Sequence, residues 1–340
     1  MTETKRIVWV DYAKFLCIYF VTLVHTPIYR PIYDIVCASL IPMFFFLSGY
    51  FFSYKKYPVF KSFVSIRWKQ LMVPYFALAG LAYIFWFFVG RHYGDDANVE
   101  TLWYSPLLGT ILGYGKQMVQ SVPLWFVMAL FVLQILYWPI GKYTIKNQYI
   151  LLIVITLISF MNVEYIKLPL PFEVNQAIAG MTFYILGMIA RQILTEKALE
   201  KYSIAFLVIG ILLVAIAVKY NVHVTFLILR FGNYGLFLLG AIGGILTTVS
   251  ISFWLSKVFG ENAFVKYIGR NTIVICGLHL IIFTLIKGVM VYIIDMPLSV
   301  LEQSVAPCMI FGFLSIIGCI PIIFLINRFC PVLVGHNLKH

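Results

Sequence analysis

Three ionisable side chains interrupt the first apolar stretch of the chain, residues 7–25: Asp11, Lys14 and His25. An α-helix turns about 100° per residue, so Lys14 and His25 fall about 20° from each other in projection and about 16 Å apart along the axis. Asp11 lies one turn below Lys14 and about 40° from His25 in the same projection. The stretch therefore predicts a helix with one narrow polar face.

This polar face has two interpretations. In the first, Asp11 and Lys14 neutralise each other at i, i+3, and His25 is an ordinary interfacial histidine. In the second, His25 is a base at one membrane face, and the acid and the lysine hold a polar channel open beside it. A charge at mid-membrane costs roughly 2.5–3.5 kcal/mol on insertion scales, so such residues usually face a protein interior or a cavity and mark function.

The composition is that of an integral membrane protein. Of the 340 residues, 62% are hydrophobic and only 11% are charged, whereas about 25% of a soluble domain is charged. The net charge of +12 is spread over short loops between apolar stretches, which argues against nucleic acid as a partner and favours the lipid bilayer. The six cysteines lack metal-site spacing, so no metal is expected.

Ten apolar windows have about the length that a bilayer requires, at residues 7–25, 35–52, 71–90, 122–139, 149–163, 177–194, 204–219, 234–255, 272–294 and 305–327. We therefore expect an all-α bundle of about ten membrane-spanning helices. The count of nine to eleven is open, because window 149–163 is short and segment 102–113 is weakly apolar. We expect one domain over residues 1–340, since the longest loop, 91–121, is too short for a core of its own.

The loops predict an orientation. When each Lys and Arg except Lys14 is assigned to the nearer window end, 17 lie on the side of the N-terminus and 7 lie on the other side. Because basic residues accumulate in cytoplasmic loops, both termini are expected in the cytoplasm, with His25 toward the opposite face.

Short motifs occur at the ends of the windows. The most basic loop contains Lys61, Arg67 and Lys69 and is followed by Pro74-Tyr75. It can anchor the chain to anionic lipid or hold the phosphates of a cytosolic cofactor. Pro123-Leu124-Trp125-Phe126 opens the fourth window, and Ile268-Gly269-Arg270-Asn271-Thr272 leads into the ninth, which carries His279 as a core histidine or a ligand contact.

In order and spacing, these motifs resemble the acyltransferase 3 family of multi-pass membrane enzymes that O-acylate bacterial glycans. Lys14 and His25 match the spacing of its Arg/Lys-x10-His motif, and Phe46-Leu47-Ser48-Gly49-Tyr50-Phe51 is similar to its F-x-L-S-G-[FY] segment. The resemblance covers Arg6 to about Phe329, and Pro123–Phe126 is most similar to the fucose O-acetylase-like branch. The family often has R-x-x-R before Pro-Tyr. Here Gln70 stands where the second arginine of that motif would be, with Lys69 beside it.

The resemblance implies an enzyme of the bacterial plasma membrane. It would transfer an acyl group, acetyl in the first instance, from cytosolic acyl-CoA to a hydroxyl of a cell-surface or lipid-linked glycan, without a metal. His25 would act as a general base or carry the acyl group covalently. The implied catalytic residues are His25, Lys14 and Asp11; the acyl-CoA ligands are Lys61, Arg67, Lys69 and Arg270; the substrate contacts are Trp125 and His279.

Two other functions remain open at this stage. A transporter or flippase for a lipid-linked saccharide also needs many spans and an intramembrane charged face. An acyltransferase could instead use a succinyl or another acyl group, or a non-glycan acceptor. A partner acyl-transfer protein and a homo-oligomer are both compatible with the sequence.

Overall fold

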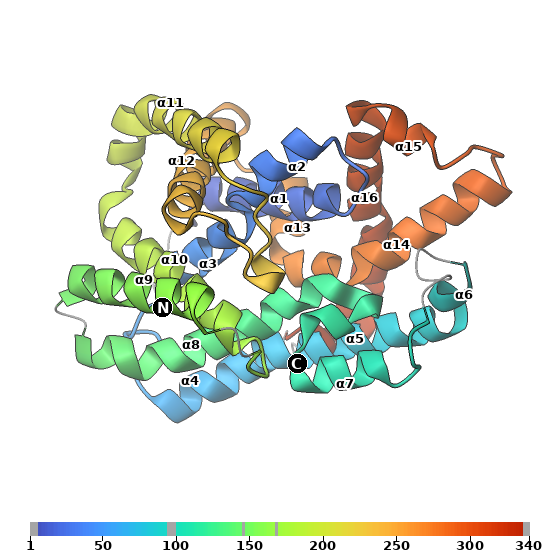
Figure 1. Cartoon of the computed structure of the whole chain (residues 1–340), viewed down its shortest axis with the longest axis horizontal. Helices are drawn as coiled ribbons and strands as arrows, with labels where there is room; N and C mark the ends of the chain where they lie inside the picture. Colours follow the sequence, from blue (N-terminus) through green and yellow to red (C-terminus); the bar gives the residue numbers. More distant parts are fainter. Residues whose placement is uncertain (1–5, 94–99, 145–146, 167–168, 336–340) are drawn as a thin grey trace.

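The computed structural model describes residues 6–93, 100–144, 147–166 and 169–335, and these ranges are almost entirely helical. No β-strand occurs among the described residues, and an isolated antiparallel bridge joins Thr225 to Arg230. The expected all-α class is therefore confirmed (Figure 1).

The helices follow one another with few long connections. In chain order they are α1 (Val8–Val24), α2 (Arg30–Cys37), α3 (Leu40–Tyr50), α4 (Phe60–Arg67), α5 (Val73–Phe85), α6 (Arg91–Tyr93), α7 (Ser105–Leu112), α8 (Trp125–Thr144), α9 (Gln148–Glu164), α10 (Val174–Ile193), α11 (Glu196–Tyr220), α12 (Tyr234–Phe259), α13 (Ala263–Arg270), α14 (Thr272–Tyr292), α15 (Val300–Gln303) and α16 (Val305–Phe329). The π-helical turns Trp68–Met72 and Trp86–Gly90 join α4, α5 and α6 into one rod.

Seven helical segments in the described ranges are long and apolar enough to cross a membrane. They are Arg30–Tyr50, Phe60–Tyr93, Val119–Thr144, Glu196–Tyr220, Tyr234–Phe259, Thr272–Tyr292 and Val305–Phe329. The expected count of about ten is not confirmed, because α1 and α9 have only 17 residues each and α10, with 20 residues, is not among the seven. The orientation of the termini remains a prediction.

The outer faces of the long helices are apolar. Ile204 and Leu212 on α11 and Phe324 on α16 are each more than half exposed. Large contiguous apolar surfaces are unfavourable in water, whereas lipid tails contact them at no such cost. The chain is therefore a multi-pass membrane protein whose outer helices face lipid.

The first helix lies inside the assembly rather than at its edge. It packs against α2, α3, α12, α13, α14 and α16, and Figure 1 shows it in blue between α12 and α16. Ala13, Cys17 and Ile18 on this helix are completely or almost completely buried. The ionisable residues of α1 can therefore face protein instead of lipid, as the cost of intramembrane charge requires.

Helices α3 and α10 cross at very close range through two glycines. A β carbon on Gly49 would overlap the carbonyl oxygen of Tyr184, and one on Gly187 would overlap that of Phe46. Small residues at such crossings let backbones approach and maximise packing contacts within a bilayer. The glycine in Phe46–Phe51 thus has a packing role, and the crossing fixes α3 beside α1.

We predict that Gly49→Ala destabilises the protein by about 1–3 kcal/mol, because the added methyl group forces α3 away from α10. The matched control is Gly80→Ala in α5, where an added β carbon would meet no atom within 4 Å. That control should be neutral or stabilising, by about 0.5–1 kcal/mol, since alanine favours the helix. Thermal unfolding in detergent measures both, and equal midpoints for Gly49→Ala and wild type would contradict the prediction.

Candidate active site

The end of α1 fixes the imidazole of His25, the residue that follows the helix. The His25 backbone N–H donates to the Thr22 carbonyl, so the Val21 carbonyl is left for the side chain. The distance from His25 Nδ1 to the Val21 oxygen is 2.7 Å. Because a carbonyl oxygen only accepts, Nδ1 carries the proton and Nε2 keeps its lone pair. Nε2 is therefore free to take a proton or to attack a carbonyl carbon.

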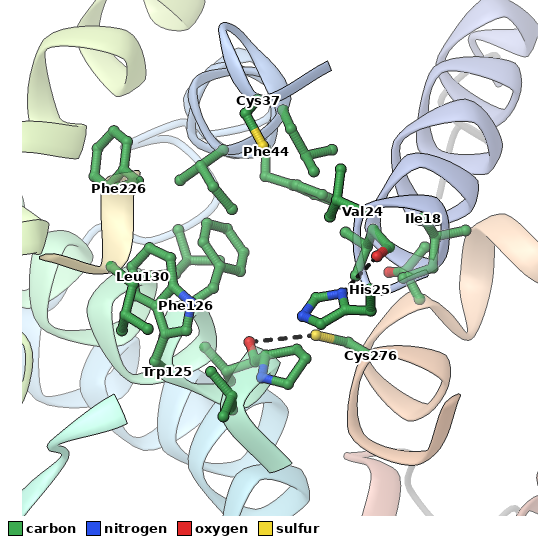
Figure 2. A pocket seen from close by; sticks show the side chains of 18 of the residues that line it. Ile18, Val24, His25, Cys37, Phe44, Trp125, Phe126, Leu130, Phe226 and Cys276 are labelled. Atoms are coloured by element: carbon green, nitrogen blue, oxygen red, sulfur yellow. Dashed lines mark hydrogen bonds between the residues drawn. The ribbon is translucent and has the colours of Figure 1, made fainter. Parts of the chain in front are cut away.

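The His25 ring projects into a cavity of about 400 Å³ (Figure 2). This volume lies within the range of roughly 300–1,000 Å³ that small-molecule sites occupy. The wall is mainly apolar and comes from α1, α2, α3, α8, α14 and the loop before α12; it includes Ile18, Val24, Cys37, Phe44, Trp125, Phe126, Leu130, Phe226 and Cys276. A polar reacting group in this cavity is shielded from most water, which can enter only from the open side of the cavity.

Hydrogen bonds to α14 hold the aromatic wall of the cavity. Cys276 Sγ lies 3.5 Å from the Pro123 carbonyl oxygen, and Ser121 Oγ donates to the Gly277 carbonyl at 3.3 Å. Trp125, which follows directly, stacks on Phe226 with ring centroids 6.0 Å apart. The sequence-predicted Trp125 thus lines the same cavity as His25, as a substrate contact requires.

His279 lies beside His25 but does not line the cavity. The two rings are 5.0 Å apart between centroids, in an edge-to-face arrangement. His279 Nδ1 donates to the Ile275 carbonyl at 2.9 Å, and its Nε2 has no hydrogen-bond partner in the described part of the chain. The structure therefore brings both predicted histidines together, with His279 fully buried against the edge of His25. Direct contact between His279 and a substrate remains a prediction.

The charged residues near the start of α1 are arranged differently from the sequence interpretation. The Asp11 carboxylate accepts a hydrogen bond from Arg6 Nε at 2.6 Å, so its direct ion-pair partner is Arg6 and not Lys14, contrary to the first of the two interpretations. Lys14 Nζ lies 5.6 Å from the centre of the Phe51 ring, where a cation is attracted to the aromatic face. Neither Asp11 nor Lys14 lines the cavity that contains His25.

The basic residues before α5 divide into two groups. Lys61 and Lys69 line an open crevice of about 500 Å³ together with Trp68. Arg67 instead lies 4.7 Å from the centre of the Tyr57 ring, and its Nη1 donates to Gln70 Oε1 at 2.9 Å. The predicted cluster of three phosphate ligands is therefore not formed. The Arg67 side chain packs on Tyr57, in the loop before α4, whereas the two lysines face outward.

Residues of the π-helical turn Trp68–Met72 line both this crevice and the cavity. Lys69 lines the crevice, and Leu71, two residues later, lines the cavity. π-helical turns inside longer helices occur frequently at functional sites. One short turn thus presents a cation to the outside and an apolar side chain to the interior.

Arg270 lies near the start of α1 and not near His25. It ends α13, where a β carbon on the preceding Gly269 would lie 3.3 Å from the Asp11 carbonyl oxygen and 3.6 Å from Lys14 Cβ. The exposed Arg270 therefore adds positive charge beside Lys14.

The sequence interpretation missed a buried acid, Glu173, in the loop before α10. Only 3% of Glu173 is exposed, and its Oε1 accepts a hydrogen bond from the Gly115 N–H at 2.6 Å. Burial raises the pKa of the Glu173 carboxyl to about 7, and that hydrogen bond and the Lys116 ammonium offset part of the rise. Its only sequence signal is an acid between Phe172 and Val174, at the start of an apolar stretch.

Comparison with known proteins gives one family. Residues 7–328 match the family model described as an acyltransferase domain, which covers nearly the whole chain. No curated protein and no solved structure matches the chain.

We predict that diethyl pyrocarbonate, which acylates unprotonated imidazole nitrogens, modifies His25 much faster than His279. Nε2 of His25 opens into the cavity, whereas the His279 side chain has 0% exposure. Peptide mass spectrometry after graded exposure measures both rates, and the exposed His92 on α6 serves as the reactive reference. Complete protection of His25 in the folded protein would show that its ring does not face an accessible cavity.

Proposed function

Because the chain belongs to the acyltransferase 3 family, we propose that it transfers an acyl group from cytosolic acyl-CoA to a hydroxyl of a cell-surface or lipid-linked glycan. Family membership makes the protein an acyltransferase that moves acyl groups other than aminoacyl groups. The proposal adds acetyl as the acyl group, acyl-CoA as the donor, a glycan as the acceptor and the bacterial plasma membrane as the location. The fucose O-acetylase-like branch also remains part of the proposal.

The observation that carries this proposal is the free Nε2 of His25 in the cavity. Its Nδ1–H is bound to the Val21 carbonyl at 2.7 Å, which supports one tautomer with its lone pair toward the cavity. A neutral imidazole with a free Nε2 lone pair can accept a proton from a hydroxyl. The cavity walls then position the reacting groups and restrict the entry of water.

The transfer follows from this arrangement. His25 Nε2 removes the proton of the acceptor hydroxyl while the hydroxyl oxygen bonds to the thioester carbonyl carbon. The carbon–sulfur bond then breaks, CoA leaves as a thiolate, and the proton on His25 passes to sulfur. In a covalent variant, Nε2 itself bonds to the carbonyl carbon and the carbon–sulfur bond breaks, releasing the CoA thiolate. The acceptor hydroxyl then attacks the acyl-imidazole, its oxygen replaces Nε2 on the carbonyl carbon, and its proton passes to the thiolate. An acyl-His25 adduct, trapped and detected by mass spectrometry without acceptor, identifies the covalent variant.

The position of the lysine crevice supports a donor that enters from the basic side. Lys61 and Lys69 line the crevice, and the excess of basic residues in this loop favours the cytoplasm. Ammonium groups at this mouth suit the phosphates of acyl-CoA. Leu71, on the same turn, lines the cavity, and in our proposal the pantetheine arm extends from the crevice toward His25.

Lys14 and Arg270 place positive charge near the start of α1. Lys14 is part of the family spacing with His25 but does not line the cavity. We therefore propose that Lys14, with Arg270 beside it, attracts the anionic donor rather than contacting the reacting carbonyl. The transporter alternative has no observation in its favour.

We predict that His25→Ala lowers kcat by roughly 10²–10⁴-fold, the usual contribution of a general base, while acyl-CoA binding is retained. Release of free CoA thiol by purified protein in nanodiscs measures turnover, and equilibrium binding of acetyl-CoA measures affinity. His92→Ala is the matched control, because His92 is exposed on α6 away from the cavity. Wild-type turnover by His25→Ala would remove the proposed mechanism.

The crevice generates a second prediction. Replacing Lys61 and Lys69 together by alanine should raise the KM for acetyl-CoA while leaving kcat nearly unchanged, because phosphate contacts act equally in ground and transition states. The matched control is Lys142→Ala in α8, whose Nζ lies 4.6 Å from the Trp138 ring centre and outside the crevice. An unchanged KM in the double variant would assign both lysines to membrane topology.

A further inference from the structure

A second cavity, of about 670 Å³, lies next to the one that contains His25. Leu227 lines both cavities. Gly115 marks the junction, because a β carbon there would lie 2.5 Å from Trp125 Cβ, 2.7 Å from Leu227 Cδ1 and 2.9 Å from Glu173 Oε1. The absence of a side chain at Gly115 therefore lets the aromatic wall of the first cavity meet the acid of the second.

Glu173 is the buried acid of this second cavity, and the proposed acyl transfer does not use it. Its Oε1 accepts a hydrogen bond from Gly115 N–H. Its Oε2 accepts none from the residues that the structure describes, and it is open to the cavity that Glu173 lines. A carboxylate oxygen needs donors, which water or a ligand in the cavity can supply.

The backbone around Glu173 is constrained to place this carboxylate. Phe172 and Glu173 both have positive φ angles, 60° and 54°, which are uncommon for residues other than glycine. The Phe172 N–H donates to the Leu112 carbonyl at 2.7 Å, which ties the loop to the end of α7. The acid and the backbone that carries it are therefore both tied to the segment 112–115.

The remaining polar lining identifies the kind of ligand. Lys116 and Arg230 line the cavity and are exposed, and Tyr114 supplies an aromatic ring. Sugar hydroxyls can donate to a carboxylate and accept from cations, and a sugar ring packs well on an aromatic face. The segments concerned follow odd-numbered predicted spans, on the side opposite the basic loop.

We infer that this second cavity binds a saccharide of the acceptor, with Glu173 Oε2 accepting hydrogen bonds from its hydroxyls and Lys116 and Arg230 donating to its oxygens. The inference rests on the proposed function and deepens it. The adjoining sugar hydroxyl reaches His25 past Leu227, while the rest of the acceptor stays in the second cavity. The donor and the acceptor therefore occupy different cavities that meet near His25.

The test uses full-length protein in nanodiscs, acetyl-CoA as the donor and a panel of neutral and uronate methyl glycosides as acceptor probes. Glu173→Gln keeps an amide oxygen for the Gly115 N–H, so the fold should be retained, and it should raise the KM for the glycoside at least tenfold. The KM for acetyl-CoA and the glycoside-independent hydrolysis of the thioester should not change. Lys116→Gln, at an exposed position, should also raise the glycoside KM, and Glu164→Gln at the end of α9 is the matched acidic control.

The outcomes separate this inference from the proposed function. A wild-type glycoside KM in both Glu173→Gln and Lys116→Gln overturns the saccharide site, as does an effect confined to the KM for acetyl-CoA. Absence of thioester turnover by wild-type protein with every probe overturns the acyl transfer instead. Calorimetric titration of the glycosides in the absence of acetyl-CoA tests the saccharide site independently of turnover. Binding that Glu173→Gln weakens supports the site, and no binding of any glycoside overturns it.

Discussion

The hydrogen bond from His25 Nδ1 to the Val21 carbonyl depends on the helix ending at Val24. In a continuing helix, that carbonyl would accept a backbone N–H from within the helix and would not be available to an imidazole. The early end therefore selects the tautomer of His25 and leaves Nε2 toward the cavity. A carboxylate commonly orients a catalytic histidine, but here a helix end performs this role without placing another charge in the membrane.

A helix that ends inside the protein requires neighbours on all sides, and the remaining helices provide them. Six other helices pack on α1, and the close crossing of α3 and α10 at Gly49 and Gly187 brings α3 inward. The outer surface of α11 and α16 is left apolar for lipid. Ionisable residues on α1 are consequently compatible with a membrane protein, because they contact aromatic rings, an arginine and a cavity rather than hydrocarbon.

The two cavities differ in the charged side chains that lie near them. The π-helical turn Trp68–Met72 contributes Lys69 to the lysine-lined crevice and Leu71 to the first cavity, and Glu173 lines the second cavity beyond Leu227. Under the proposed function, the acyl donor and the acceptor hydroxyl would enter from the two sides and meet near His25. The aromatic and apolar walls of the first cavity would then limit loss of the donor to water.

The sequence by itself determined the membrane class, the all-α fold and the family, because apolar length and motif spacing are local properties of the chain. It also singled out His25 and Trp125, which the structure places in the wall of one cavity. The pairing of Asp11 with Arg6, the turning of Arg67 toward Tyr57 and the position of Lys14 outside the cavity were decided only by tertiary structure. Helical projection orders residues on one helix, but the partner of a long side chain depends on which neighbouring groups fill the space around it. Glu173 shows the same limit: its burial arises from Gly115, 58 positions away in the chain, and no local pattern encodes such a contact.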